Sequence, residues 1–96
     1  MIPRFTKECI DQYVQKGVPL GDFLTAVMAN DLMEAFSRAD ENNTRHMRDI
    51  VFYVYNHTPH ICHGNYGLVD EWIIKHKEGR ILDDMSINPT KIDTSL

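Results

Sequence analysis

The chain has 96 residues with 14 acidic and 10 basic side chains, so its formal net charge is −4, and 43% of its residues are apolar. This length suits one domain with a modest core and marginal stability, which oligomerisation or a metal can reinforce. The charge balance argues against a general nucleic-acid binder, which needs a clustered basic face, and the mixing of both signs argues against a DNA mimic. The sequence shows no export signal or membrane span, so we expect a cytoplasmic protein in which Cys9 and Cys62 are reduced.

The first predicted helix lies within residues 5–17. Its apolar positions form one stripe at helical spacing, made of Cys9, Ile10, Tyr13 and Val14. Thr6 is the predicted N-cap, and Gly17 is the predicted left-handed C-cap. Residues 18–21 then turn the chain.

Residues 22–40 read as two short helices or as one bent helix. Asp22 is the predicted cap of the first half, and Asn30 and Asp31 interrupt the apolar pattern. We favour two helices with Asn30 capping the second, because asparagine competes with helical hydrogen bonds and suits a cap.

The third helical region covers residues 39–57 and ends before Pro59. Its apolar face is predicted from the helical spacing of Met47, Ile50, Val51 and Val54. The run at residues 50–55 is also rich in β-branched and aromatic side chains, so a strand is the alternative there. The polar first half of the region favours a helix.

A last helix is predicted within residues 64–79, with Asn65 as its N-cap and Gly79 at its end. One side of it gathers Leu68, Val69, Trp72, Ile73 and His76. We therefore expect an all-α compact bundle of four or five short helices, forming a single domain over residues 1–79. Residues 80–96 are predicted to be a tail, flexible or docked on the domain or a partner through Ile81, Leu82, Met85 and Ile87.

The stretch HTPHICHG at residues 57–64 raises the question of a metal site. Its candidate ligands are His57, His60, Cys62 and His63. Structural zinc takes four converging ligands, and this set lacks the distant second pair that zinc modules usually provide. We therefore expect an interhelical turn with a buried cysteine and no cofactor, and keep a zinc-stabilised module as an alternative. A catalytic Cys–His pair is not expected, because adjacent side chains rarely face each other.

Aromatic and basic side chains of the third region supply candidate binding residues. Phe52, Tyr53 and Tyr55 make its second half apolar nearly all round, which fits either core burial or an interface. A helix-turn-helix DNA-binding motif over residues 31–55 is one hypothesis for this part of the chain. Its candidate DNA-contacting residues are Arg38, Arg45 and Arg48. The same arginines with Tyr53 stacking on a base would suit the sequestering of a nucleotide signal.

Residues 2–74 resemble a group of small proteins encoded by tailed bacteriophages. The pattern is an Ile-Pro start, a Gly-x-Pro turn, Phe-Leu before Asn-Asp-Leu, Ala-Asp before Asn, a Tyr-x-Tyr-Asn helix end, Pro and Cys before a glycine, and a late Trp. The matching residues are Ile2, Pro3, Gly17, Pro19, Gly21, Phe23, Leu24, Asn30, Asp31, Leu32, Ala39, Asp40, Asn42, Tyr53, Tyr55, Asn56, Pro59, Cys62, Gly64 and Trp72. The group has no established activity, so the resemblance implies a setting, which is the takeover of an infected bacterial cell.

We expect a non-catalytic protein that binds a host protein and inhibits or redirects it in counter-defence. This expectation rests on the phage resemblance, the apolar-rich third helix and the lack of a catalytic motif. A homo-oligomer is a further expectation for the same apolar surface. The alternatives are the DNA-binding regulator, the zinc-stabilised module and the nucleotide-sequestering protein described above.

Overall fold

The computed structural model describes residues 1–78, which form six α-helices and one 3-10 turn without a strand in that range. The elements are α1 (Arg4–Lys16), α2 (Asp22–Met28), α3 (Leu32–Arg38), α4 (Glu41–Arg45), α5 (Met47–His57), η1 (His60–Cys62) and α6 (Tyr66–Glu78). The prediction of a compact all-α fold is confirmed. The expected end at Gly79 and the expected tail at residues 80–96 lie outside the described residues.

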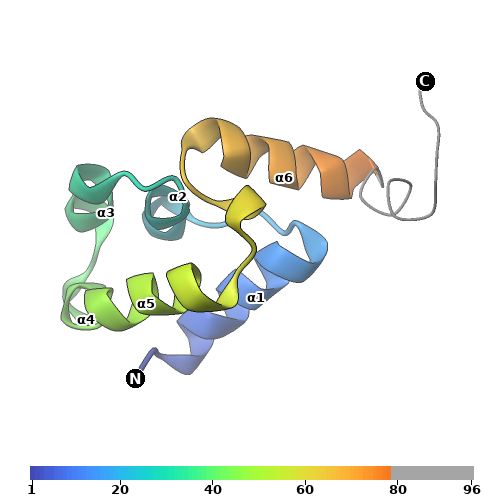
Figure 1. Cartoon of the computed structure of the whole chain (residues 1–96). Coiled ribbons are helices and arrows are strands. Elements are labelled where there is room, and N and C mark those ends of the chain that lie inside the picture. Colours follow the sequence, from blue (N-terminus) through green and yellow to red (C-terminus); the bar gives the residue numbers. More distant parts are fainter. Residues whose placement is uncertain (79–96) are drawn as a thin grey trace.

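Most helices pack against one or two others (Figure 1). Helix α2 contacts both α3 and α6, α1 contacts α5, and η1 lies against α6. No helix of residues 1–78 is long and apolar enough to cross a membrane.

Helix α1 ends as predicted but begins earlier than predicted. Gly17 is in the left-handed conformation at φ 67°, and its N–H donates to the Tyr13 carbonyl at 2.9 Å. The prediction of Thr6 as N-cap is wrong, because the Lys7 N–H already donates to the Pro3 carbonyl at 3.0 Å. Pro3 precedes the helix with its fixed φ, and Thr6 is buried inside the first turns.

The division of residues 22–40 into two helices is confirmed, but both predicted caps are wrong. Asn30 adopts φ 60°, a left-handed conformation that asparagine tolerates, and turns the chain between α2 and α3. The cap of α3 is Asp31, whose carboxylate accepts from the Glu34 N–H at 3.3 Å. Gly21 occupies the cap position of α2, so Asp22 is its first helical residue.

The region expected as one helix over residues 39–57 is split into α4 and α5 at His46, which explains why residues 1–78 hold more helices than predicted. Asp40 caps α4 by accepting from the Asn43 N–H at 2.7 Å. The last eleven residues of the region are helical, so the strand alternative is wrong. Val51 was predicted on the buried face but is 46% exposed. The face of α5 that packs on the domain is narrower and consists of Met47, Ile50 and Val54.

Helix α6 closes the core. Asn65 caps it as predicted, because its side-chain oxygen accepts from the Leu68 N–H at 2.8 Å. Val69 and Trp72 are buried against the main cluster of core residues. His76, on the same side, lies so close to Gly17 that a Cβ added to the glycine would overlap the histidine Cβ. Glycine at this position therefore allows both the left-handed cap of α1 and the close packing of α6 on it.

A hydrogen-bonded centre joins α1, η1 and α6. The fully buried Tyr13 donates its hydroxyl proton to the Cys62 carbonyl at 2.7 Å. The Trp72 indole N–H donates to the Tyr13 carbonyl at 3.0 Å. Burial raises the pKa of Tyr13 far above its usual value, so the hydroxyl stays a donor. These bonds fix the His-rich turn against the first and last helices.

Candidate functional site

The His-rich turn forms η1, and its cysteine belongs to the core. Cys62 is fully buried, as predicted, and its sulfur donates to the Pro59 carbonyl at 3.1 Å. Burial raises the pKa of the thiol, so the sulfur is a neutral thiol at neutral pH. This environment is that of a small apolar side chain in a packed interior.

The three imidazoles of the turn contact different neighbours. The ring of His57 packs on Tyr53 at a centroid distance of 5.0 Å, and the ring of His60 meets the edge of Tyr55 at 6.5 Å. His63 lies 6.0 Å from the ring of His60, and its buried Nε2 has no hydrogen-bond partner in the described part of the chain. Burial and the neighbouring His60 lower the pKa of His63, so its ring is held neutral.

Metal coordination needs several donors that converge on one point. Within residues 1–78, no three His, Cys, Asp or Glu side chains are arranged to hold a metal ion. The zinc hypothesis stays a prediction, and its test is the metal content of the purified protein.

Helix α5 presents a mostly apolar face to solvent, on the side away from the core. This surface, called the α5 outer face, consists of Arg48, Val51, Phe52 and Tyr55. These positions follow the helical spacing of three and four residues, so their side chains share one side of the helix. Phe52 is 62% exposed and Tyr55 is 68% exposed. Two of the three aromatic residues predicted to bind a partner therefore lie together at the surface.

The third predicted aromatic residue, Tyr53, points elsewhere and joins α5 to α1. Its hydroxyl donates to Asp11 in a short hydrogen bond, and the Lys7 ammonium lies 2.9 Å from the same carboxylate. Burial raises the pKa of Tyr53, with a further rise from its bond to Asp11. Burial alone would raise the pKa of Asp11, but the bonds from Tyr53 and Lys7 outweigh it and the pKa is lowered. Tyr53 is thus occupied by contacts within the domain.

Two of the predicted arginines are paired with acidic side chains. Arg38 lies 2.6 Å from Glu34 on α3 and 3.4 Å from Asp22 on α2. Arg45 lies 4.0 Å from Glu41, one turn earlier on α4. Arg48 is exposed on the α5 outer face. These exposed pairs partly neutralise the basic charge that a phosphate would need, although each contributes little to stability.

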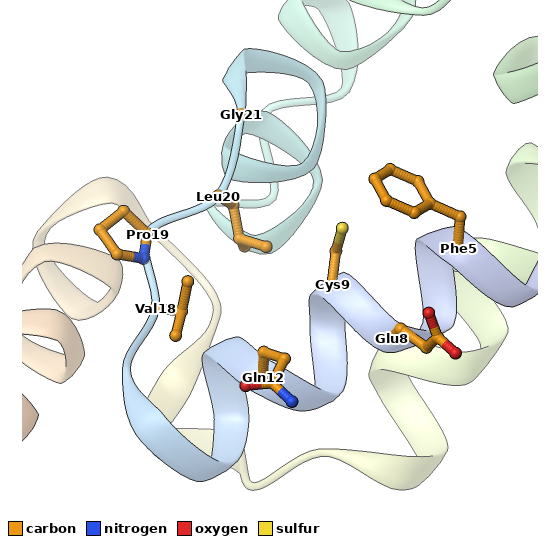
Figure 2. A pocket seen from close by; sticks show the side chains of 8 residues that line it. All are labelled: Phe5, Glu8, Cys9, Gln12, Val18, Pro19, Leu20 and Gly21. Carbon is orange, nitrogen blue, oxygen red and sulfur yellow. The ribbon is translucent and has the colours of Figure 1, made fainter.

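A groove between α1 and residues 18–21 was not predicted. It has a volume of about 450 Å³ and is open to solvent. Figure 2 shows the side chains that line it, which are Phe5, Glu8, Cys9, Gln12, Val18, Pro19, Leu20 and Gly21. The sequence carried a signal for this site, because Phe5 stands off the apolar stripe of α1 and the following turn holds three consecutive apolar residues.

Comparisons with known proteins give no match for this chain among protein families, curated proteins or solved structures.

Proposed function

We propose that this chain is a non-catalytic binding protein whose α5 outer face contacts another protein. The observation that carries the proposal is the exposure of Val51, Phe52 and Tyr55 on one side of a helix whose other side already packs on the domain. Aromatic side chains give a large contact area at low entropic cost and are typical anchors of protein interfaces.

The packing of α5 favours an interface over a structural role for these side chains. Met47, Ile50 and Val54 supply the contact of α5 with the core, and Tyr53 ties the helix to α1 through Asp11. The core contacts of α5 therefore involve neither Phe52 nor Tyr55. Apolar side chains that lie outside the core and cluster at the surface indicate an interaction site.

The resemblance to small phage proteins supplies the setting of the proposal. A protein that acts by covering a surface of a host protein needs a complementary face and no chemistry of its own. We therefore infer that the partner is a bacterial host protein that this chain inhibits or redirects, as part of counter-defence. A partner helix with its own apolar stripe suits a shallow helical face of this kind. Self-association through the same face is the competing outcome.

The test is affinity capture from a bacterial lysate with three forms of the protein. The wild type is compared with Phe52→Ser/Tyr55→Ser and with the control Met33→Ser, which removes an apolar side chain that is 81% exposed on α3. We expect one partner to be captured by the wild type and the control and lost by the double variant. Equal capture by all three forms, or no specific capture by any, would contradict the proposal.

The oligomeric state separates the competing outcome. Native mass spectrometry of the untagged protein, with and without chelator, reports the number of subunits and any bound zinc. A dimer that the Phe52→Ser/Tyr55→Ser variant abolishes would assign the α5 outer face to self-association. A monomer with one bound zinc ion would support the hypothesis of a zinc-stabilised module instead.

The other hypotheses gain no specific observation from residues 1–78. A DNA reader over residues 31–55 and a nucleotide-binding protein both need free arginines, and Arg38 and Arg45 are paired with acidic side chains. The nucleotide hypothesis also needs the ring of Tyr53, which already contacts His57 and the Lys7 ammonium.

A further inference from the structure

The groove between α1 and residues 18–21 has walls that the fold already holds in place. The Thr25 hydroxyl donates to the Leu20 carbonyl at 3.2 Å, and the Thr25 N–H donates to the Gly21 carbonyl at 2.9 Å. Cys9 and Leu20 pack against the main cluster of core residues, so the groove is backed by the core. A preformed site binds a ligand without the cost of ordering its own walls.

The size and the lining of the groove suit a small apolar molecule. Its volume of about 450 Å³ falls within the range of roughly 300–1,000 Å³ that is typical of small-molecule sites. Figure 2 shows the sulfur of Cys9 pointing into the groove between Phe5 and Leu20. The ring of Phe5 is 76% exposed, so it is available for contact with a ligand. A hydrocarbon group that enters the groove is removed from water together with these side chains.

The charge of the groove is negative. Glu8 is the charged residue among the described side chains that line it, and it lies three positions after Phe5, so the carboxylate and the ring share one side of α1. Glu8 makes no ion pair within residues 1–78, whereas its neighbour Lys7 is paired with Asp11 at 2.9 Å. An unpaired carboxylate attracts a cation, and the face of an aromatic ring attracts an organic ammonium group in particular.

We propose that this groove binds an apolar organic cation, which is a small molecule with an ammonium group beside a hydrocarbon chain. The hydrocarbon chain covers Cys9, Val18 and Leu20, and the ammonium group contacts the Glu8 carboxylate and the Phe5 ring. A neutral molecule with the same hydrocarbon chain lacks the second set of contacts, so the groove selects its ligand by charge. This inference is independent of the α5 outer face, which lies on another helix and is assigned to a protein partner.

The rate at which iodoacetamide alkylates Cys9 measures whether the groove is occupied. Both cysteines are free thiols, but Cys62 is fully buried, so alkylation of the folded protein reports on Cys9. The rate is measured against the concentration of three probes, all kept below any concentration at which they form micelles: octyltrimethylammonium, octanol and tetramethylammonium. The first probe carries both parts of the proposed ligand, and each of the other two carries one part.

Two variants each remove one recognition element, and each has a matched control. Glu8→Gln removes the carboxylate charge, and Glu41→Gln makes the same change on α4, outside the residues that line the groove. Phe5→Ser removes a ring that is 76% exposed, and Phe52→Ser removes a ring that is 62% exposed on the α5 outer face. All four side chains are exposed, so we expect the variants to fold, and circular dichroism checks their helix content.

We expect octyltrimethylammonium to slow the alkylation of Cys9 at lower concentrations than octanol or tetramethylammonium. Glu8→Gln and Phe5→Ser are each expected to raise the required concentration by about two- to fivefold, as for exposed ion-pair and cation–π contacts, and the controls to leave it unchanged. The proposal would be overturned if octanol were as effective as octyltrimethylammonium, or if Phe5→Ser and Phe52→Ser weakened binding equally. Unchanged alkylation with all three probes would also overturn it.

Discussion

Replacing Tyr13 by phenylalanine tests the hydrogen-bonded centre of the fold. The substitution keeps the buried ring and removes only the hydroxyl that donates to the Cys62 carbonyl at 2.7 Å. No other donor to this carbonyl is found among residues 1–78. The bond from the Trp72 indole to the Tyr13 backbone is retained, so the variant isolates the hydroxyl.

The expected loss follows from leaving a buried acceptor without a partner. Such a group costs about 1–3 kcal/mol of the free energy of unfolding. In a domain of this size, each 1 kcal/mol lowers the melting temperature by about 4–8 °C. The assay is urea denaturation followed by the fluorescence of Trp72, the single tryptophan of the chain and a direct neighbour of Tyr13.

Tyr66→Phe is the matched control. The Tyr66 hydroxyl also donates a bond of 2.7 Å, but to the Asp31 carboxylate at the surface, where water replaces the lost partner. We expect this variant to lose less stability than Tyr13→Phe, because surface substitutions of this kind usually cost little. If the two variants lose the same stability, or if Tyr13→Phe loses none, the centre does not hold α1, η1 and α6 together as inferred.

Three further predictions concern the turns around α1 and α3. Gly17→Ala is expected to cost about 1–2 kcal/mol for the left-handed conformation alone, and more through overlap with His76, whereas Gly21→Ala has open space at its Cβ and serves as control in thermal melts. Asp31→Ala removes the cap of α3, and a loss of about 0.5–2 kcal/mol is expected in the same melts; no loss would show that the cap is dispensable. The bond to Asp31 raises the pKa of Tyr66 to about 12. The folded state therefore favours the neutral phenol, so its contribution to stability is complete below the usual tyrosine pKa of about 10 and is lost as the pH rises toward 12. Phenolate absorbance should show Tyr66 titrating earlier in Asp31→Ala; an unchanged titration would refute the role of Asp31.

Local sequence signals predicted the end of a helix correctly where one residue type suits that position for a clear conformational reason. Gly17 is the C-cap of α1 because glycine reaches positive φ without strain. Asn65 caps α6 because its side chain accepts a backbone N–H three residues later. Such signals act within one turn of the chain, so the sequence alone is enough to place them.

The predicted N-caps that were wrong lie where two nearby residues can each begin the helix. Thr6 is a good cap in isolation, yet Pro3 starts α1 earlier because its carbonyl already accepts the first helical bond. Asn30 and Asp31 are both good caps, and the left-handed turn at Asn30 leaves the role to Asp31. When neighbouring residues have similar N-cap preferences, those preferences cannot say which of them is the cap. The path of the chain into the helix decides between them.

The α5 outer face could be predicted in part, for a reason that lies in α5 itself. The second half of this helix is apolar on more than one side, so its periodicity allows several rotations about the helix axis. The bond from Tyr53 to Asp11 and the burial of Ile50 and Val54 select one rotation, and that rotation turns Phe52 and Tyr55 outward. A helix needs only one apolar side to pack on a domain. Because α5 has a second side that is held outward by polar contacts to α1, the surface that the proposal assigns to a partner is the one that folding leaves unused.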